Sequence, residues 1–218
     1  MNGCNAQFIG SPEVFVRANI INNIRWFQNA GRPEASVNNS MIVMANSLKE
    51  ANFDLARGET NEGKNVYDLR LCNSLVKNDI PINGYWCPFI QGNTLPGYVD
   101  IPRYNPIYRF VFTPAMNGCA FVVTNSPKGR DWFRVYHNQH PGMRSVTDLI
   151  RRESGEDLFS YFSFNDYGTQ NNPNAFNFLH YRNSTWMYVS QPQIFTINTH
   201  GFGIGYRPGG IVVTQSIF

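Results

Sequence analysis

Hydrophobic residues in the first third of the chain recur at the spacing of an α-helix. Between 38 and 51 they occupy positions i, i+3, i+4 and i+7, which places them on one face of a helix. Similar spacing predicts a helix over 11–31, which Ser11 and Pro12 begin, and another over 65–77. The polar segment 57–64 is predicted to be a surface loop between the second and third helices.

From Tyr98 onward the pattern changes to short β-branched and aromatic runs that Pro, Gly and Asn separate, which is typical of strands. The predicted strands are 107–113, 119–124, 132–137, 158–164, 176–181, 185–190, 193–198 and 210–217. One short helix is expected over 146–152, capped by Ser145 and ended near Gly155. The glycine-rich segment 201–210 precedes a strand and not a helix, so we interpret it as a turn rather than a phosphate-binding loop.

Helices that come first and strands that come later predict an α+β fold. We expect a central mixed or antiparallel β-sandwich flanked by helices, most of them in the N-terminal third. Neither a repeat nor a break in composition separates two cores, so 1–218 is predicted to be a single domain.

Charged residues make up only 15% of the chain, and the formal net charge is +3. So small a net charge predicts no nucleic-acid partner and no anionic-membrane footprint. No stretch approaches the ~20 consecutive apolar residues that a membrane-spanning helix needs. The N-terminal residues also lack the basic and apolar regions of a Sec signal peptide.

The four cysteines form no C-x-x-C pair, and their uneven spacing fits neither a zinc ribbon nor a dense disulfide framework. They are Cys4, Cys72, Cys87 and Cys119. We therefore expect free thiols in a reducing compartment, with no metal and no organic cofactor. Cys72 and Cys87 are interpreted as packing residues.

One cysteine stands in a pattern that indicates chemistry. Cys119 follows Gly118 at the start of a strand, and the next strand ends at His137. If Asn125 pairs with Asp131 in this hairpin, Cys119 faces His137 directly, with Cβ atoms ~4.5–5.5 Å apart. If the loop is one residue tighter, Tyr136 takes that place and the imidazole points to the opposite face.

An imidazole beside a thiol withdraws its proton and creates a thiolate nucleophile. Gly118 lets a substrate carbonyl approach the backbone closely, and the Cys119 N–H, with a further donor from Asn117, forms the expected oxyanion site. His140 is the alternative base. The competing interpretation is structural, because a free cysteine on a strand is more often a buried core residue.

Asn117-Gly118-Cys119 and the strand histidine His137 resemble bacterial glutamine deamidase toxins of the cytotoxic necrotizing factor and Burkholderia lethal factor type. In that family Ser-Gly-Cys begins a core strand, a neighbouring strand carries the histidine, and Asn117 stands where the family has serine. The resemblance covers 107–140. It implies that the backbone carbonyl of Thr113 orients the imidazole and that a sandwich surrounded by helices forms one catalytic domain.

The leading hypothesis is a toxin or effector, a Cys–His hydrolase that deamidates a glutamine side chain of a host protein through a thioester. The resemblance implies a Rho-family GTPase or a translation-initiation helicase as target. The protein is expected to leave a bacterium, act in the host cytosol and be a monomer. A thiol protease or acyl transferase shares the same dyad. A binding module with aromatic, Asn-rich strands, in which Cys119 is simply packed, is the alternative from a different class.

Overall fold

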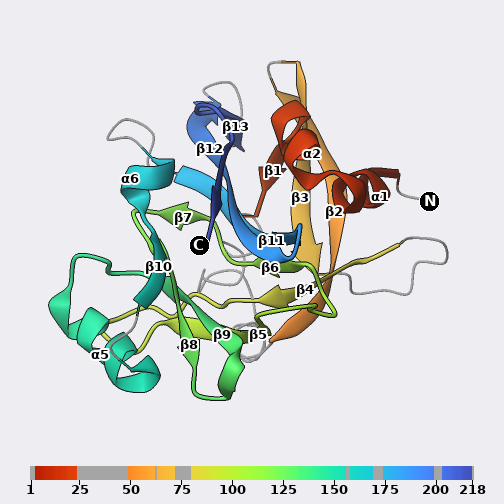
Figure 1. The fold of residues 1–218 in the computed structure, drawn as a ribbon. Helices are drawn as coiled ribbons and strands as arrows, with labels where there is room; N and C mark the ends of the chain where they lie inside the picture. The colour runs from red at the N-terminus through yellow and green to blue at the C-terminus, as the bar shows by residue number, and fades with distance from the viewer. Residues whose placement is uncertain are drawn as a thin grey trace.

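The computed structural model describes residues 3–23, 49–61, 63–71, 80–155, 158–168, 174–198 and 203–217. Within these residues the fold is mixed α+β, strands predominate, and two curled β-sheets form the body of the molecule (Figure 1). The smaller sheet has the order β10 (Leu158–Phe162), β8 (Ala120–Ser126), β9 (Gly129–Asn138) and β5 (Gly97–Pro102), and every neighbouring pair is antiparallel.

The larger sheet runs from an N-terminal strand to a C-terminal one. Its order is β1 (Ile20–Asn22), β3 (Lys64–Leu71), β2 (Glu50–Asn61), β4 (Ile82–Trp86), β6 (Phe110–Phe112), β11 (Asn174–Arg182), β12 (Thr185–Asn198) and β13 (Gly203–Pro208). Two short strands lie off this path: β14 (Val213–Ser216) pairs with β12, and β7 (Met116–Asn117) pairs with β11. The pairs β1–β3 and β4–β6 are parallel, so the sheet is mixed.

The two sheets pack face to face on one apolar core. Val99, Phe121 and Val135 of the smaller sheet meet Leu179 and Tyr188 of the larger sheet there. Removing this much apolar surface from water is the main favourable term in folding. The residues just before β8, Cys119 among them, therefore lie at the margin of the space between the two sheets.

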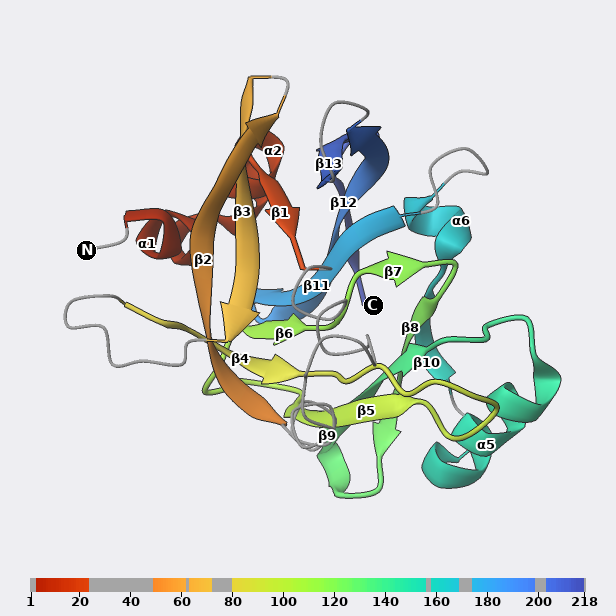
Figure 2. The same ribbon diagram turned by 180° about the vertical axis from the view of Figure 1, so that it is seen from behind.

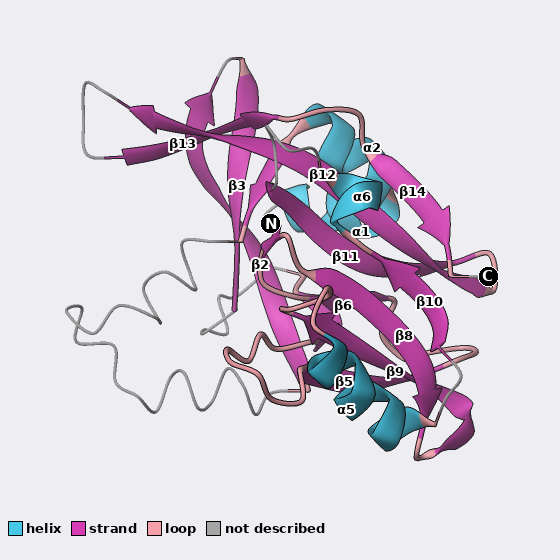
Figure 3. Cartoon of the chain, turned by 90° about the vertical axis from the view of Figure 1, so that its left-hand side faces the viewer, coloured by secondary structure: helices cyan, strands magenta, loops and turns pink. Residues whose placement is uncertain are grey.

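Helices cover the outer faces of both sheets. The helices α1 (Gly3–Gly10) and α2 (Pro12–Ala18) lie against the larger sheet (Figure 2). Their Phe8 and Phe15 pack on Phe112 and Phe178 of that sheet. The helix α5 (Arg144–Ser154) lies on the smaller sheet, on the side away from the shared core (Figure 3), and its Ile150 packs there. A fourth helix, α6 (Phe164–Tyr167), follows β10. Two of these four described helices lie far beyond the N-terminal third, which corrects the expectation that helices gather there. None of the described helices is long and apolar enough to cross a membrane.

The predicted helix over 65–77 is wrong where the structure describes it. Residues 64–71 form β3, which lies between β1 and β2 in the sheet. Val66, Tyr67 and Leu69 are buried, whereas Arg70 keeps 56% of its side chain exposed. The helix was predicted because Val66 and Leu69, with Cys72 and Val76, stand at distances along the sequence that also fit one face of a helix.

The other N-terminal predictions are only partly covered. The helix predicted over 11–31 ends at Ala18, and β1 follows at Ile20. The end of the helix predicted over 38–51 is the start of β2, while 24–48 lies outside the described residues. Residues 57–61 and 63–64, the described part of the predicted loop, instead belong to a hairpin formed by β2 and β3.

Predictions for the second half of the chain agree better with the structure. Strands β6, β8, β9, β10 and β11 overlap the predicted runs, and α5 contains the helix predicted over 146–152. This helix ends at Gly155, whose φ of +79° favours glycine, but Met143 and not Ser145 is its N-cap. The runs 185–190 and 193–198 form one strand, β12, and most of the predicted turn over 201–210 is β13.

Candidate functional site

The β8–β9 hairpin sets the relative position of Cys119 and His137, and its register differs from the prediction. Asn125 pairs with Phe133 rather than Asp131, and His137 pairs with Phe121. A bulge next to Ser126 inserts additional β9 residues beside the turn, which moves the register by two residues. Neither predicted partner, His137 or Tyr136, therefore lies opposite Cys119; extending the observed register places Gln139 there. Because the shift is even, His137 remains on the face of the sheet that carries Phe121.

Cys119 immediately precedes the first residue of β8. Gly118 precedes it with φ +78°, a left-handed conformation that glycine adopts without strain. The Cys119 side chain is 8% exposed, and its Sγ lies 4.0 Å from the carbonyl oxygen of Asn117. Burial raises the pKa of this thiol above its usual value, so the resting side chain is neutral. The hydroxyl of Tyr167 on α6 donates a hydrogen bond of 2.7 Å to the Cys119 carbonyl oxygen and fixes the backbone there.

His137 is fully buried and held through one ring nitrogen. Its Nδ1 lies 2.6 Å from Oγ1 of Thr113, and this hydroxyl donates its proton to the carbonyl oxygen of Cys87 at 2.7 Å. A hydroxyl has one proton, so Thr113 accepts from His137, and Nδ1 carries the imidazole proton. Nε2 is then unprotonated and carries a lone pair, and it has no hydrogen-bond partner among the residues that the structure describes. Burial lowers the pKa of His137 to about 3, which keeps the ring neutral.

The contact between Thr113 and His137 corrects one atom of the sequence-based prediction. The backbone carbonyl of Thr113, which was expected to orient the imidazole, instead accepts a hydrogen bond of 2.7 Å from Nδ2 of Asn23. The side-chain hydroxyl of the same residue makes the contact with the ring. Thr113 therefore contacts the imidazole through its side-chain hydroxyl and not through its backbone carbonyl.

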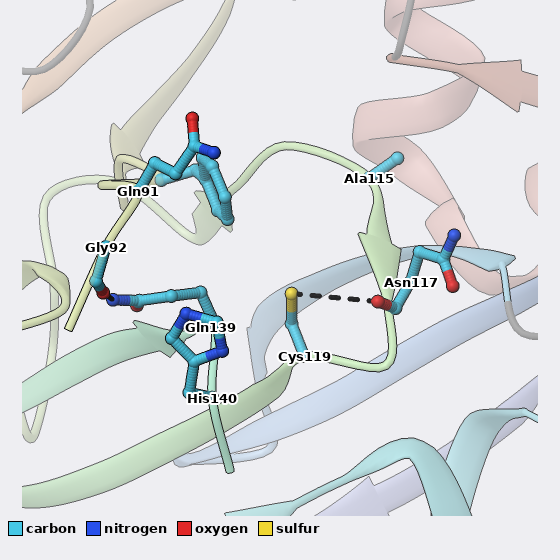
Figure 4. A pocket seen from close by; sticks show the side chains of 8 residues that line it. Gln91, Gly92, Ala115, Asn117, Cys119, Gln139 and His140 are labelled. Carbon is cyan, nitrogen blue, oxygen red and sulfur yellow. Dashed lines mark hydrogen bonds between the residues drawn. The ribbon is translucent and has the colours of Figure 1, made fainter. Parts of the chain in front are cut away.

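A pocket of about 420 Å³ lies beside Cys119. Its lining consists of Phe89, Gln91, Gly92, Ala115, Asn117, Cys119, Gln139 and His140 (Figure 4). Three of the predicted site residues, Cys119, Asn117 and His140, thus meet in one cavity. His137, Thr113 and Gly118 are not part of the lining. His137 is nevertheless adjacent, because its ring packs edge-on against Phe89, with 5.2 Å between ring centroids.

The sequence analysis did not predict four residues of the pocket wall, which are Phe89, Gln91, Gly92 and Gln139. Gln139 donates a hydrogen bond of 2.6 Å to the carbonyl oxygen of Gly92, which joins the end of β9 to the segment that follows β4. A correct hairpin register would have brought Gln139 to Cys119. No sequence signal indicated Phe89, Gln91 or Gly92, because their segment reaches the pocket only through the packing of the two sheets.

A model of the Mcf1 activator-binding domain matches residues 6–203. The chain belongs to this family. Among curated proteins, none matches the sequence. The matched range of the Mcf1 activator-binding domain includes strands of both sheets, the β8–β9 hairpin and every residue that lines the pocket. The likeness to glutamine deamidase toxins is a separate matter and stays a prediction.

The described residues of this Mcf1 activator-binding domain also place the remaining candidate ligands and thiols. Among them, no group of three His, Cys, Asp or Glu side chains is arranged to hold a metal ion. Cys4, Cys87 and Cys119 are free thiols, and Cys72 lies outside the described residues. Cys87 is completely buried, and burial raises its pKa to about 12.

Proposed function

We propose that this chain is a protein-binding domain whose partner is an activator protein. The observation that carries the proposal is the match of the Mcf1 activator-binding domain to 6–203, nearly the whole chain. The family name states that an activator is bound, and we propose that this activator is itself a protein.

The state of Cys119 also supports a binding role. A nucleophilic cysteine needs a stabilised thiolate, and burial here favours the neutral thiol. Its Sγ lies near the Asn117 carbonyl oxygen, an acceptor that cannot donate a hydrogen bond to a thiolate. The sequence-based alternative of a binding module with a packed cysteine therefore gains support.

The test is direct binding. The full chain, immobilised, is incubated with cytosolic extract from cultured eukaryotic cells, and captured proteins are identified, purified and titrated back by calorimetry. We expect one purified protein to form a stoichiometric complex with the chain. If no purified protein binds with a defined stoichiometry, the proposal is wrong.

A second function, glutamine deamidation of a host protein in the host cytosol, is favoured by the tautomer of His137. Its Nε2 has no hydrogen-bond partner among the described residues, and its ring packs against Phe89, which lines the same pocket as Cys119. The two curled sheets around one core are also compatible with the β-sandwich expected from the resemblance.

In this second proposal the thiol proton of Cys119 passes to Nε2 of His137, and the sulfur attacks the carboxamide carbon of the substrate. The C–N bond breaks, and the nitrogen takes the proton from the imidazolium and leaves as ammonia. Water then hydrolyses the thioester to give glutamate and the free thiol. The reaction consumes one water molecule and needs no oxidant or metal.

Mass spectrometry of candidate host proteins after incubation with the chain tests this second proposal. A glutamine-to-glutamate change of about +1 Da is expected with the unmodified chain and with Cys4→Ser, which removes a free thiol elsewhere. Cys119→Ser is expected to abolish it. Chain cleavage or acyl transfer in place of ammonia release indicates the protease or transferase alternative. Equal modification by Cys119→Ser excludes any role of this thiol in the chemistry.

A further inference from the structure

The loop 103–109, which joins β5 to β6, presents two large apolar side chains to water. Ile107 is 85% exposed and Tyr104 is 59% exposed. A single exposed apolar residue is ordinary on a protein surface. Here two such side chains stand three residues apart in one short loop, and both leave apolar area in contact with water.

The backbone of this loop is fixed at its start, middle and end. The N–H of Arg103 donates to the carbonyl oxygen of Asp131 at 2.8 Å, and the N–H of Asn105 donates to the hydroxyl of Tyr181 at 3.1 Å. The carbonyl oxygen of Arg109 accepts from the N–H of Tyr181 at 2.8 Å. A partner that binds the loop therefore loses little free energy in ordering it.

Cationic side chains border the two apolar ones. Arg109 is exposed, and no carboxylate of the described residues lies within ion-pair distance of it. Arg182, at the end of the neighbouring strand β11, keeps half of its side chain exposed while it contacts Glu13 at 3.1 Å. Of these charges only that of Arg182 is balanced by a nearby acid, so the border of the loop carries positive charge toward solvent.

We propose that the 103–109 loop is the surface through which the chain binds its activator protein. The partner presents an apolar cleft, which receives Ile107 and Tyr104, and carboxylates at the rim of that cleft, which face Arg109 and Arg182. Tyrosine and arginine are the residue types that most often dominate binding energy at such interfaces. Charge complementarity at the rim sets orientation and the rate of encounter. This inference rests on the proposed binding function.

The test compares two variants that remove equally exposed isoleucines. Ile107→Asp combined with Tyr104→Ala alters the loop, and Ile211→Asp is the control, because Ile211 is 87% exposed on the segment between β13 and β14. Both are titrated against the activator protein purified with the unmodified chain. The loop variant is expected to bind at least about 30-fold more weakly, as for removal of a dominant interface contact, while the control stays within about twofold.

Arg109→Glu tests the charge of the rim. The unmodified chain is expected to bind more weakly as NaCl is raised from about 50 to 300 mM, and the variant is expected to lose most of this dependence. If the purified partner binds the loop variant as tightly as the unmodified chain, the surface is assigned wrongly although the binding function stands. If no purified protein binds the unmodified chain, the binding function fails and this inference fails with it.

Discussion

The side-chain hydroxyl of Thr113 lies 2.6 Å from Nδ1 of His137 and holds the imidazole in one tautomer. Because the carbonyl oxygen of Cys87 takes the hydroxyl proton, the ring must donate from Nδ1 and leave Nε2 bare. Such a ring is ready to accept a proton, but its burial opposes the charge that would result. The contact with Thr113 therefore gives His137 the tautomer of a base, while its burial lowers its basicity.

Replacing Thr113 tests this assignment. Thr113→Val removes the hydroxyl and leaves the Cys87 carbonyl and the His137 N–H without partners, so we expect a loss of about 1–3 kcal/mol in the free energy of unfolding. Thr113→Ser retains the hydroxyl and should lose less. Nitrogen-15 NMR of the imidazole should show protonated Nδ1 in the unmodified chain and in the serine variant. A protonated Nε2 in the unmodified chain would contradict the assignment.

Stability should depend on pH through His137. In the unfolded chain this histidine takes up a proton near its ordinary pKa of 6.5, whereas in the folded chain its pKa is lowered to about 3. Between these two values the unfolded state binds more protons, so the free energy of unfolding falls as pH falls, by up to about 1.4 kcal/mol per pH unit.

Urea unfolding at pH 6.5 and pH 4.5 measures this effect. His137→Gln is expected to lose about 2–3 kcal/mol less on acidification than the unmodified chain. Burial also lowers the pKa of His180, so the unmodified chain loses stability from both histidines, and the difference between the two proteins isolates His137. Identical losses in both proteins would mean that His137 titrates normally when folded.

The sequence predicted those elements of the fold whose residue patterns are short and local, and it failed where distant parts of the chain determine the structure. The strands of the β8–β9 hairpin and the helix α5 were found, because their patterns are short and turns bound them. The hairpin register was wrong, because a bulge beside Ser126 leaves no mark in the residue types. The pattern over β3 predicted a helix, because the spacing of Val66 and Leu69 also fits one face of a helix.

The residues of the candidate site also divide into those that a local sequence pattern predicted and those that only the packing of distant segments brings together. Cys119, Asn117 and His140 line one pocket, and all three come from a segment with a readable pattern. Phe89 and Gly92 come from a distant segment, and only the packing of β4 and β5 on the rest of the structure brings them there. Thr113 was named for its carbonyl, although the hydroxyl makes the contact, because a sequence does not say which atom of a residue faces a neighbour.

The three free thiols of the described residues should differ in their rate of alkylation by iodoacetamide. Cys4 is half-buried and should react first, Cys119 is 8% exposed with a raised pKa and should react more slowly, and Cys87 should be protected. The Cys119 rate should still rise above pH 9, since only its thiolate reacts. Peptide-resolved mass spectrometry measures each rate. A Cys119 that reacts faster than Cys4 at neutral pH would mean a stabilised thiolate, as deamidation requires.

Gly97 on β5 limits where the wall of the pocket can lie. A Cβ atom at this position would stand 1.9 Å from the carbonyl oxygen of Pro88, so Gly97→Ala must displace the segment that continues into Phe89 and Gly92. We expect a loss of about 3 kcal/mol in the free energy of unfolding, together with faster alkylation of Cys119 as the wall moves away. Gly142→Ala is the matched control, because a Cβ there meets no atom within 4 Å and should change stability by less than about 0.5 kcal/mol. Equal stabilities of the two variants, with Cys119 unchanged in both, would show that the wall yields without cost and that Gly97 does not hold the pocket in shape.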